Sequence, residues 1–379
     1  MARIRVLVVD DSVVVRRLVT DALSSDPAIE VVGIAANGQI AQAKVEQLRP
    51  DAVTMDIEMP VCDGIQAVKA LRAAAYRGPI IMFSTLTERG AAATLDALAA
   101  GANDYVTKPA NVGSVQQALA QVAGELIPRI KALVPRPTGG AVAGAPATAS
   151  ATGSTPGRPA AVPAPRTRPA VVLRPAPARR PVRAVVIGSS TGGPEALSRV
   201  LGGLTAALPV PVVVVQHMPP VFTRQLAARL DRIGPSRVTE SAGEEELRPG
   251  SVLIAPGDRH LTLVRSANGA RTRLTEDPPV NYCRPAVDVL FRSATQVFGG
   301  DLLAVVLTGM GSDGRGGCED VVAAGGTVLA QDEPTSVVWG MPGAVATAGL
   351  AHAVVPLDEV AGAVTRAVTS SLTGTGAAR

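Results

Sequence analysis

The chain has 379 residues, enough for two or three domains that each bury a hydrophobic core. Hydrophobic residues make up 47% of it, which excludes global disorder, and aromatic residues only 2%, which argues against a surface that stacks nucleic-acid bases. Residues 133–181 hold seven Arg and no acidic residue, so the formal net charge of +4 becomes −3 outside this stretch. The positive charge therefore gives no support for nucleic-acid binding.

The cysteines and the hydropathy pattern point away from secretion and from membranes. Cys62, Cys283 and Cys318 lie far apart without metal-ligand spacing, and an odd number argues against a disulfide framework. The first eleven residues already contain two aspartates, unlike a signal peptide, and no apolar run is long enough to cross a bilayer. We therefore expect a cytoplasmic protein with no direct membrane insertion.

Residues 1–132 alternate short apolar runs, rich in β-branched residues, with longer amphipathic stretches. This alternation predicts an α/β domain with a doubly wound parallel sheet, whose ligand chemistry lies at the carboxyl ends of the strands. The expected strands are Ile4–Val9, Ile29–Ala35, Ala52–Asp56, Ile80–Ser84 and Asp104–Val106. The expected helices are Val13–Ser24, Gly38–Gln47, Gly64–Ala74, Gly90–Ala100 and Ser114–Ile130.

Residues 133–181 differ in composition from both flanks. They include eleven Pro and many Ala, Gly and Thr residues. No helix or strand periodicity survives at this density of Pro, because each one removes a backbone donor and restricts the residue before it. The stretch is predicted to be a disordered, semi-extended linker between two domains.

Residues 182–371 alternate strands and helices again, which predicts a second doubly wound, mostly parallel domain of Rossmann-like type with a β-hairpin insertion. The expected strands are Arg183–Gly188, Val210–Val215, Val252–Ala255, Leu302–Leu307, Thr327–Ala330 and Ala351–Val355. The expected helices are Pro194–Leu204, Thr223–Ile233, Pro285–Phe298, Gly316–Ala324 and Leu357–Val368. The expected hairpin strands are His260–Val264 and Arg271–Thr275.

Several polar side chains follow the strands of the first domain. Asp10 and Asp11 come directly after the first strand, and Asp56 ends the third. Three carboxylates at one sheet edge repel each other unless a hard cation such as Mg2+ neutralises them. Ser84 and Lys108 end or follow the next strands. Acids, hydroxyl, ammonium and metal together suit a phosphoryl group on Asp56.

This part of the chain carries a recognisable set of residues: Asp10-Asp11, Asp56, Met59-Pro60, Gly64, Ser84 and Tyr105-Val106-Thr107-Lys108-Pro109. With them, residues 3–130 resemble the response-regulator receiver family. The resemblance implies phosphorylation of Asp56 by a histidine kinase, with Mg2+ held by Asp11, Asp56 and Asp10. It also implies that Ser84 acts as the switch hydroxyl and Tyr105 as the rotameric aromatic.

A glycine-rich loop at 188–194 follows the first strand of the second domain and opens a helix. Glycines on both sides expose a hydroxyl at a helix N-terminus, where backbone N–H groups favour developing negative charge. A phosphate-binding loop is the competing interpretation, but no Lys follows the glycines. Of the three histidines, only His217 ends the neighbouring strand and shares a sheet edge with Ser190, whereas His260 and His352 do not.

A second glycine-rich loop, residues 308–314, follows the strand predicted at Leu302–Leu307 and delivers Asp313. A helix N-cap would also account for this Asp. Ser190, His217 and Asp313 at three strand ends form a triad by role: nucleophile, general base and orienting carboxylate. Their order along the chain excludes the α/β-hydrolase fold, although Gly188-x-Ser190-x-Gly192 matches its nucleophile elbow.

Residues 182–371 contain five motifs: Gly188 to Pro194, Gln216-His217-Met218-Pro219, Ala255 to Asp258, Pro278-Pro279-Val280-Asn281 with Arg284 to Asp288, and Leu307 to Gly314. With these motifs, residues 182–370 resemble the chemotaxis protein-glutamate methylesterase family of the CheB type. The resemblance implies hydrolysis of glutamate γ-methyl esters on methylated transmembrane chemoreceptors, with methanol released, and in many members deamidation of receptor glutamines. It makes Ser190 the nucleophile, His217 the base and Asp313 the orienter. Thr191 and Met310 would lie beside the site, with the Met310 N–H as an oxyanion donor.

The esterase reaction itself needs no cofactor under this interpretation, and a chemotaxis histidine kinase supplies the phosphoryl group. Ser189 departs from the family, in which Ala is expected, so two hydroxyls lie side by side; the motif favours Ser190. One alternative is a non-catalytic, receiver-controlled binding module or phosphate sink. A receiver-regulated transcription factor is disfavoured, because the second domain has no helix-turn-helix pattern.

Overall fold

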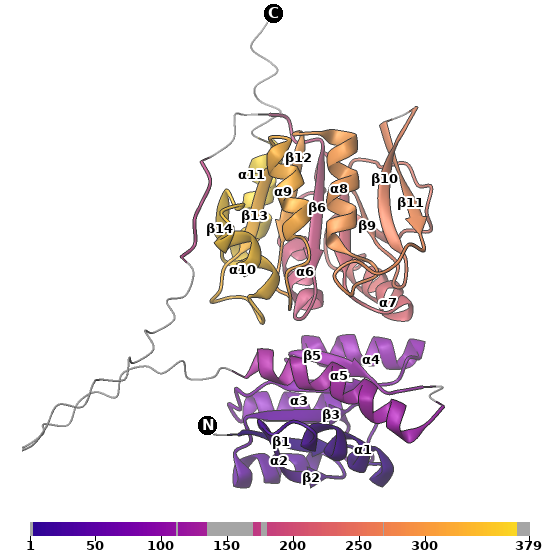
Figure 1. Cartoon of the computed structure of the whole chain (residues 1–379), viewed down its shortest axis with the longest axis vertical. Coiled ribbons are helices and arrows are strands. Elements are labelled where there is room, and N and C mark those ends of the chain that lie inside the picture. The colour runs from indigo at the N-terminus through magenta and orange to yellow at the C-terminus, as the bar shows by residue number, and fades with distance from the viewer. Residues whose placement is uncertain (1–2, 111–112, 135–169, 176–179, 268, 370–379) are drawn as a thin grey trace, which may run out of the picture.

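The computed structural model describes residues 3–110, 113–134, 170–175, 180–267 and 269–369. Within them, the chain forms two α/β domains, one from each half of the sequence, stacked along the long axis of the molecule (Figure 1). The fold class predicted from the sequence is confirmed for both halves. The predicted linker falls mostly on residues 135–169 and 176–179, which lie outside the described residues.

The first half builds a five-stranded, fully parallel sheet in the order β2-β1-β3-β4-β5. Its strands are β1 (Ile4–Val9), β2 (Ile29–Ala35), β3 (Ala52–Asp56), β4 (Ile80–Ser84) and β5 (Asp104–Thr107). Its helices are α1 (Val13–Ser24), α2 (Gly38–Leu48), α3 (Gly64–Ala73), α4 (Glu88–Ala99) and α5 (Val115–Leu133). Each of these five helices begins at a side-chain cap, from Ser12, Asn37, Asp63, Thr87 and Ser114 in chain order.

Each face of this sheet buries a separate apolar cluster. Helices α1 and α5 cover one face and α2, α3 and α4 the other. The inner strands β3 and β4 are buried on both faces, as expected for a parallel sheet with helices on both sides. This arrangement leaves the carboxyl ends of the strands as the place for polar side chains.

The second half builds a seven-stranded parallel sheet in the order β14-β13-β12-β6-β7-β9-β8. Its strands are β6 (Ala184–Ser189), β7 (Val212–Gln216), β8 (Arg237–Glu240), β9 (Ser251–Ile254), β12 (Leu302–Val306), β13 (Thr327–Gln331) and β14 (Ala353–Val355). Its helices are α6 (Gly193–Gly202), α7 (Pro220–Leu230), α8 (Val287–Phe298), α9 (Arg315–Ala323), α10 (Gly340–Thr347) and α11 (Leu357–Thr369).

The order of this sheet reverses at β6. From β6 the chain continues to β7 and β9 on one side, and it later returns through β12 and β13 on the other. Such a reversal opens a crevice at the carboxyl ends of the central strands, which is where doubly wound sheets bind their ligands. The predicted hairpin is confirmed as β10 (His260–Ser266) and β11 (Gly269–Thr275), which pair antiparallel and pack on α8.

Two elements of the second half were not predicted. Strand β8 is a short edge strand with only one buried side chain, so it lacks the apolar run that marks the central strands. Helix α10 contains Pro342 and two glycines, which locally argue against a helix, and it forms because Met341, Val345 and Ala346 are buried in the core. Among the described residues, no helix is both long and apolar enough to span a membrane.

The two halves pack against each other through α4 and β5 on one side and α6 and α7 on the other. The Tyr105 ring stacks on the Phe222 ring with centroids 4.6 Å apart and planes 10° from parallel. Arg229 on α7 makes an ion pair with Asp96 on α4 at 2.6 Å. One continuous apolar cluster includes buried residues of both halves. The carboxyl ends of the β6 sheet therefore face the first half of the chain (Figure 1).

Candidate active site

Three neighbouring strands carry the predicted triad. Ser190 follows β6 directly, His217 follows β7 directly, and Asp313 lies in the loop between β12 and α9. Because β12, β6 and β7 are adjacent and parallel, their carboxyl ends meet at one edge. Ser190 and His217 line the same cavity of about 710 Å³. The three residues are thus brought to a single crevice from positions far apart in the sequence.

The backbone around Ser190 is held by the surrounding loops. Its N–H donates to Thr308 O at 3.0 Å, and its carbonyl accepts from Gly193 N at 2.8 Å and from Gln216 Nε2 at 2.9 Å. The turn requires Gly192, which caps α6 at φ 76° in the left-handed region. Gly309 approaches so closely that a Cβ there would lie 2.8 Å from Ser190 Cβ. Ser190 therefore has a fixed position at the N-terminus of α6.

The neighbouring Ser189 occupies a different environment. Its side chain is fully buried, and its hydroxyl donates to Gln216 Oε1 at 2.7 Å. Ser190 is half-buried and lines the cavity, and its hydroxyl makes no hydrogen bond within the described part of the chain. Only the second of the two hydroxyls is therefore available to a substrate.

His217 and Asp313 form a close pair. His217 Nε2 lies 2.9 Å from Asp313 Oδ2, and the carboxylate is 3% exposed. Burial lowers the pKa of His217, but hydrogen bonds with Asp313 and Cys283 outweigh burial and raise it to about 9. The pairing fixes Nε2 toward Asp313 and leaves Nδ1 as the nitrogen for other chemistry. In the described residues no hydrogen bond joins this ring to Ser190 Oγ; in enzymes without substrate, catalytic hydrogen bonds are often long or poorly aligned.

Asp313 is also bound by backbone N–H groups. Its Oδ2 accepts from Val287 N at 2.6 Å, and its Oδ1 accepts from Asp288 N at 3.1 Å and Gly314 N at 3.0 Å. Burial raises the pKa of Asp313, but the hydrogen bonds with His217, Val287 and Asn281 outweigh it and hold the pKa below its ordinary value. The carboxylate therefore stays ionised. It caps the N-terminus of α8, not that of its own helix α9, whose cap is Gly314.

Thr191 follows Ser190 in the chain, and Thr191 and Met310 both line the cavity that Ser190 lines. Among the described residues, no hydrogen bond uses the backbone N–H of either one. The Thr191 hydroxyl points away from Ser190 and donates to Asp104 Oδ2 at 2.8 Å. The two free N–H groups are the donors that could stabilise a developing oxyanion near Ser190.

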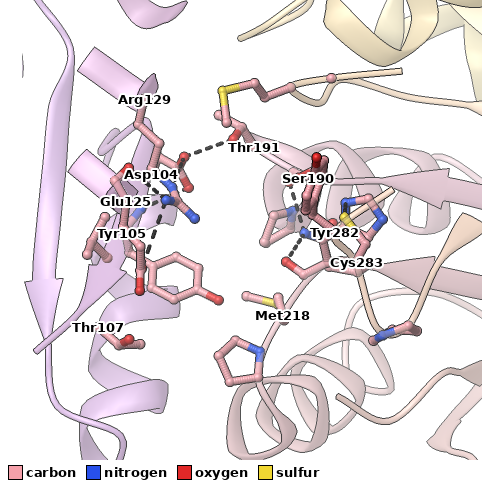
Figure 2. A pocket seen from close by; sticks show the side chains of 18 of the residues that line it. Asp104, Tyr105, Thr107, Glu125, Arg129, Ser190, Thr191, Met218, Tyr282 and Cys283 are labelled. Atoms are coloured by element: carbon pink, nitrogen blue, oxygen red, sulfur yellow. Dashed lines mark hydrogen bonds and ion pairs between the residues drawn. The ribbon is translucent and has the colours of Figure 1, made fainter. Parts of the chain in front are cut away.

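The first half of the chain forms one wall of this cavity. Asp104, Tyr105 and Arg129 face Ser190 and Thr191 across it (Figure 2). Asp104 accepts the Thr191 hydroxyl and lies 3.2 Å from Arg129 Nε. Burial raises the pKa of Asp104 despite these partners. The candidate active site is therefore partly covered in this structure.

The second predicted cluster lies at the carboxyl ends of β1 and β3. Carboxylate oxygens of Asp10, Asp11 and Asp56 lie within 4.8 Å of one another. Lys108 Nζ lies 2.8 Å from Asp56 Oδ1 and 3.0 Å from Asp10 Oδ2, so one ammonium pairs with two carboxylates. Burial raises the pKa of Asp56 to about 6, with Lys108 opposing and Asp10 assisting. Three clustered carboxylates are a set of oxygen donors that fits a hard divalent cation.

The two predicted switch residues lie on neighbouring strands: Ser84 is the last residue of β4, and Tyr105 lies within β5. Ser84 lines a cavity of about 300 Å³ together with Asp56 and Lys108. Its hydroxyl contacts α4, accepting from Thr94 at 2.7 Å and donating to Gly90 O at 3.2 Å. Tyr105 is 9% exposed and lies at the contact with Phe222. Ser84 therefore lies at the acidic cluster, and Tyr105 lies at the wall of the 710 Å³ cavity.

Three residues at the site were not singled out from the sequence. Gln216 bridges Ser189 and Ser190, Asn281 donates to Asp313 Oδ1 at 2.9 Å, and Cys283 Sγ lies 3.5 Å from His217 Nδ1. Gln216 and Asn281 belong to motifs that the sequence analysis quoted. The spacing between Cys283 and the other cysteines carries no information about its contact with the His217 imidazole.

Comparisons with known proteins cover both halves of the chain. The family model described as CheB methylesterase matches residues 185–364, and the one described as response regulator receiver domain matches residues 6–120. Among solved structures, the catalytic domain of Thermotoga maritima CheB methylesterase is 43% identical, covering 48% of this chain and 97% of that chain, with a TM-score of 0.48. The response regulator domain of Thermotoga maritima CheB is 46% identical, covering 34% and 94%, with a TM-score of 0.31.

Curated relatives cover nearly the whole chain. A protein-glutamate methylesterase/protein-glutamine glutaminase of Nocardioides sp. is 62% identical over 363 residues, which is 95% of this chain and 94% of that protein. A protein of the same name from Trichodesmium erythraeum is 44% identical over 97% of this chain and all of its own length. Identity at this level over both halves shows that the chain belongs to the CheB methylesterase family.

Proposed function

We propose that this enzyme hydrolyses γ-methyl esters of glutamate side chains on chemoreceptors, releases methanol, and is regulated by phosphorylation of Asp56. The enzyme is a protein-glutamate methylesterase and a protein-glutamine glutaminase, as its relatives are named. The observation that carries the proposal is the pair of His217 and Asp313 at 2.9 Å, on the sheet edge where Ser190 lines the cavity.

The proposed reaction uses this chain's own groups. Ser190 Oγ attacks the ester carbonyl carbon while His217 Nδ1 takes the hydroxyl proton, since Nε2 is engaged with Asp313. The N–H groups of Thr191 and Met310 stabilise the oxyanion. The proton passes to the departing methoxy oxygen, methanol leaves, and water then hydrolyses the acyl-enzyme to glutamate. A glutamine amide follows the same path with ammonia as the leaving group.

Regulation follows from the wall that the receiver half gives to the cavity. While Asp104 holds Thr191 and Tyr105 stacks on Phe222, a protein substrate cannot reach Ser190 freely. Phosphorylation of Asp56 would be transmitted through Ser84 and Tyr105 and would weaken this contact. A chemotaxis histidine kinase is the proposed phosphodonor.

The acidic cluster would hold Mg2+ through Asp10, Asp11 and Asp56, and Mg2+ would neutralise phosphate oxygens during transfer. Asp56 is the nucleophile, and Lys108 pairs with its carboxylate and would pair with the phosphoryl group. The esterase reaction needs no cofactor in this proposal. The domain division 1–132, 133–181 and 182–371 and the cytoplasmic location also stay predictions.

The test removes the hydroxyl of Ser190 or of Ser189 from the full chain. Each protein is first phosphorylated by a small-molecule phosphodonor with Mg2+. Ser190→Ala should lower methanol release from a methylated receptor by at least about 10³-fold, because the nucleophile is lost. Ser189→Ala removes only a buried hydrogen bond and serves as the matched control. Full activity of Ser190→Ala would overturn the nucleophile. Phosphorylation of Asp56 without any methanol release by the unmodified chain would instead support a non-catalytic binding module.

A further inference from the structure

Cys283 places a thiol, a possible metal ligand, in the catalytic cavity, and the proposed esterase reaction does not use it. Its thiol is half-buried, lines the cavity, and lies 3.5 Å from Nδ1 of His217. Donor atoms of His217, Cys283 and Asp313 all lie within 4.8 Å of one another. A thiol, an imidazole and a carboxylate are the donor types that bind Zn2+ in proteins.

We propose that His217 and Cys283 form a Zn2+-binding site in which Asp313 orients the imidazole, and that Zn2+ bound there inhibits the esterase reversibly. The inhibition rests on the proposed function of His217 as the base, whereas the binding does not.

The distance between the two donors supports a shared cation. A sulfur at about 2.3 Å and a nitrogen at about 2.05 Å from a tetrahedral Zn2+ lie about 3.6 Å from each other. Sγ of Cys283 and Nδ1 of His217 are 3.5 Å apart, so both can bind one ion with little movement. The thiol proton passes to solvent when the metal binds.

The other ring nitrogen is already prepared for such a site. Histidines that bind Zn2+ donate their second N–H to a carboxylate or carbonyl, which fixes the ring. Here Nε2 faces Asp313 Oδ2 at 2.9 Å, and Asp313 is itself held by three backbone N–H groups. The cavity beside Ser190 leaves space for water at the remaining coordination positions.

The position of the site explains the inhibition. The nitrogen that would bind Zn2+ is the one that takes the proton from Ser190, so metal and proton transfer exclude each other. Hard cations such as Mg2+ prefer oxygen donors and would not compete for the thiolate. The acidic cluster around Asp56 is therefore a separate site with a different preference.

The binding test uses the full, metal-free chain with Mg2+ in excess, so that the acidic cluster is occupied. Equilibrium dialysis should show about one Zn2+ bound to the unmodified chain and to Cys62→Ser, and none to Cys283→Ser. Cys62 is the matched control because it is also half-buried, whereas Cys318 is fully buried. Co2+ in place of Zn2+ should give a thiolate charge-transfer band in the first two proteins only. Equal Zn2+ binding by Cys283→Ser would overturn the site.

Two further measurements separate binding from inhibition. Zn2+ should protect Cys283 from alkylation in the unmodified chain, as read by peptide mass spectrometry, and unprotected Cys283 would contradict the site without any variant. Methanol release should fall with Zn2+ and recover with a chelator, with the inhibition constant at least about tenfold higher in Cys283→Ser, comparable to other losses at zinc sites. Binding without inhibition would keep the metal site but overturn both the inhibition and His217 Nδ1 as the base.

Discussion

The charge state of His217 decides when the site can work. The protonated ring donates from Nε2 to Asp313 and from Nδ1 toward Cys283, so two partners favour the charged form. The raised pKa stabilises the fold fully below the ordinary pKa of 6.5, and this contribution is lost as pH rises through about 9. The activity depends on pH in the opposite direction. It should increase as pH rises, because only the neutral His217 ring accepts a proton.

The pH profile should therefore rise toward alkaline pH. We expect kcat/KM for methanol release to increase up to about pH 9, where the pKa of His217 lies, and then to level off. Cys283→Ala removes one of the hydrogen bonds that favour the charged ring, so its midpoint should lie at lower pH than that of the unmodified chain. A midpoint that is unchanged or moves to higher pH would contradict the assigned contact.

At single positions, the sequence predicts which residues carry chemistry but not all of the contacts that the structure gives them. Ser190, His217 and Asp313 follow from strand ends, because parallel strands must bring those ends together. The motif favours Ser190 over the adjacent Ser189, and the structure adds that the Ser189 hydroxyl is buried against Gln216. The contact of Cys283 with His217 depends on how the loop 278–285 folds back, and no periodicity encodes it.

Helix α8 depends on a residue outside itself. Its own cap position is Ala286, which offers no side-chain acceptor, and the Asp313 carboxylate accepts the N–H groups of Val287 and Asp288 instead. A carboxylate at a helix N-terminus is also favoured by the helix dipole. The orienting acid of the site is therefore part of the fold.

Replacing this acid should cost stability as well as activity. We expect Asp313→Ala to destabilise the second half by about 1–3 kcal/mol, since buried N–H groups lose their acceptor. Ser190→Ala should leave stability nearly unchanged, because its hydroxyl has no partner among the described residues. Thermal unfolding of both full-length variants at neutral pH would measure the difference. Equal melting temperatures would show that α8 does not need this cap.

The elements themselves were predictable where burial and periodicity agree. Central strands such as β6 and β7 are buried along their whole length, and the sequence shows them as apolar runs. The edge strand β8 and helix α10 were not predicted. Their residues have only a weak intrinsic preference for strand or helix, and tertiary packing outweighs it. The site was little affected, because it lies on the central strands.

The contact between the two halves can be tested with one receiver residue. Asp104→Ala removes the acceptor of Thr191 and the partner of Arg129 without changing the esterase half. Loss of a hydrogen bond to a charged group costs about 1.5–3 kcal/mol, and here it would destabilise the contact between the two halves. The rate of methanol release by the unphosphorylated chain should therefore rise by roughly tenfold or more. Glu46→Ala on α2, at the far end of the receiver, is the control (Figure 1). Unchanged methanol release by Asp104→Ala would contradict an inhibitory contact.

Because Asp104, Tyr105 and Arg129 line the same cavity as Ser190, a receptor segment and the receiver compete for one surface. Which of the two occupies this surface then depends on their concentrations and affinities. The apparent affinity for the receptor falls in proportion to the fraction of molecules whose cavity is open. Where receptors are densely clustered, we expect them to open some unphosphorylated molecules by themselves. Phosphorylation should then act mainly by lowering the apparent KM and should leave the turnover of the open site unchanged.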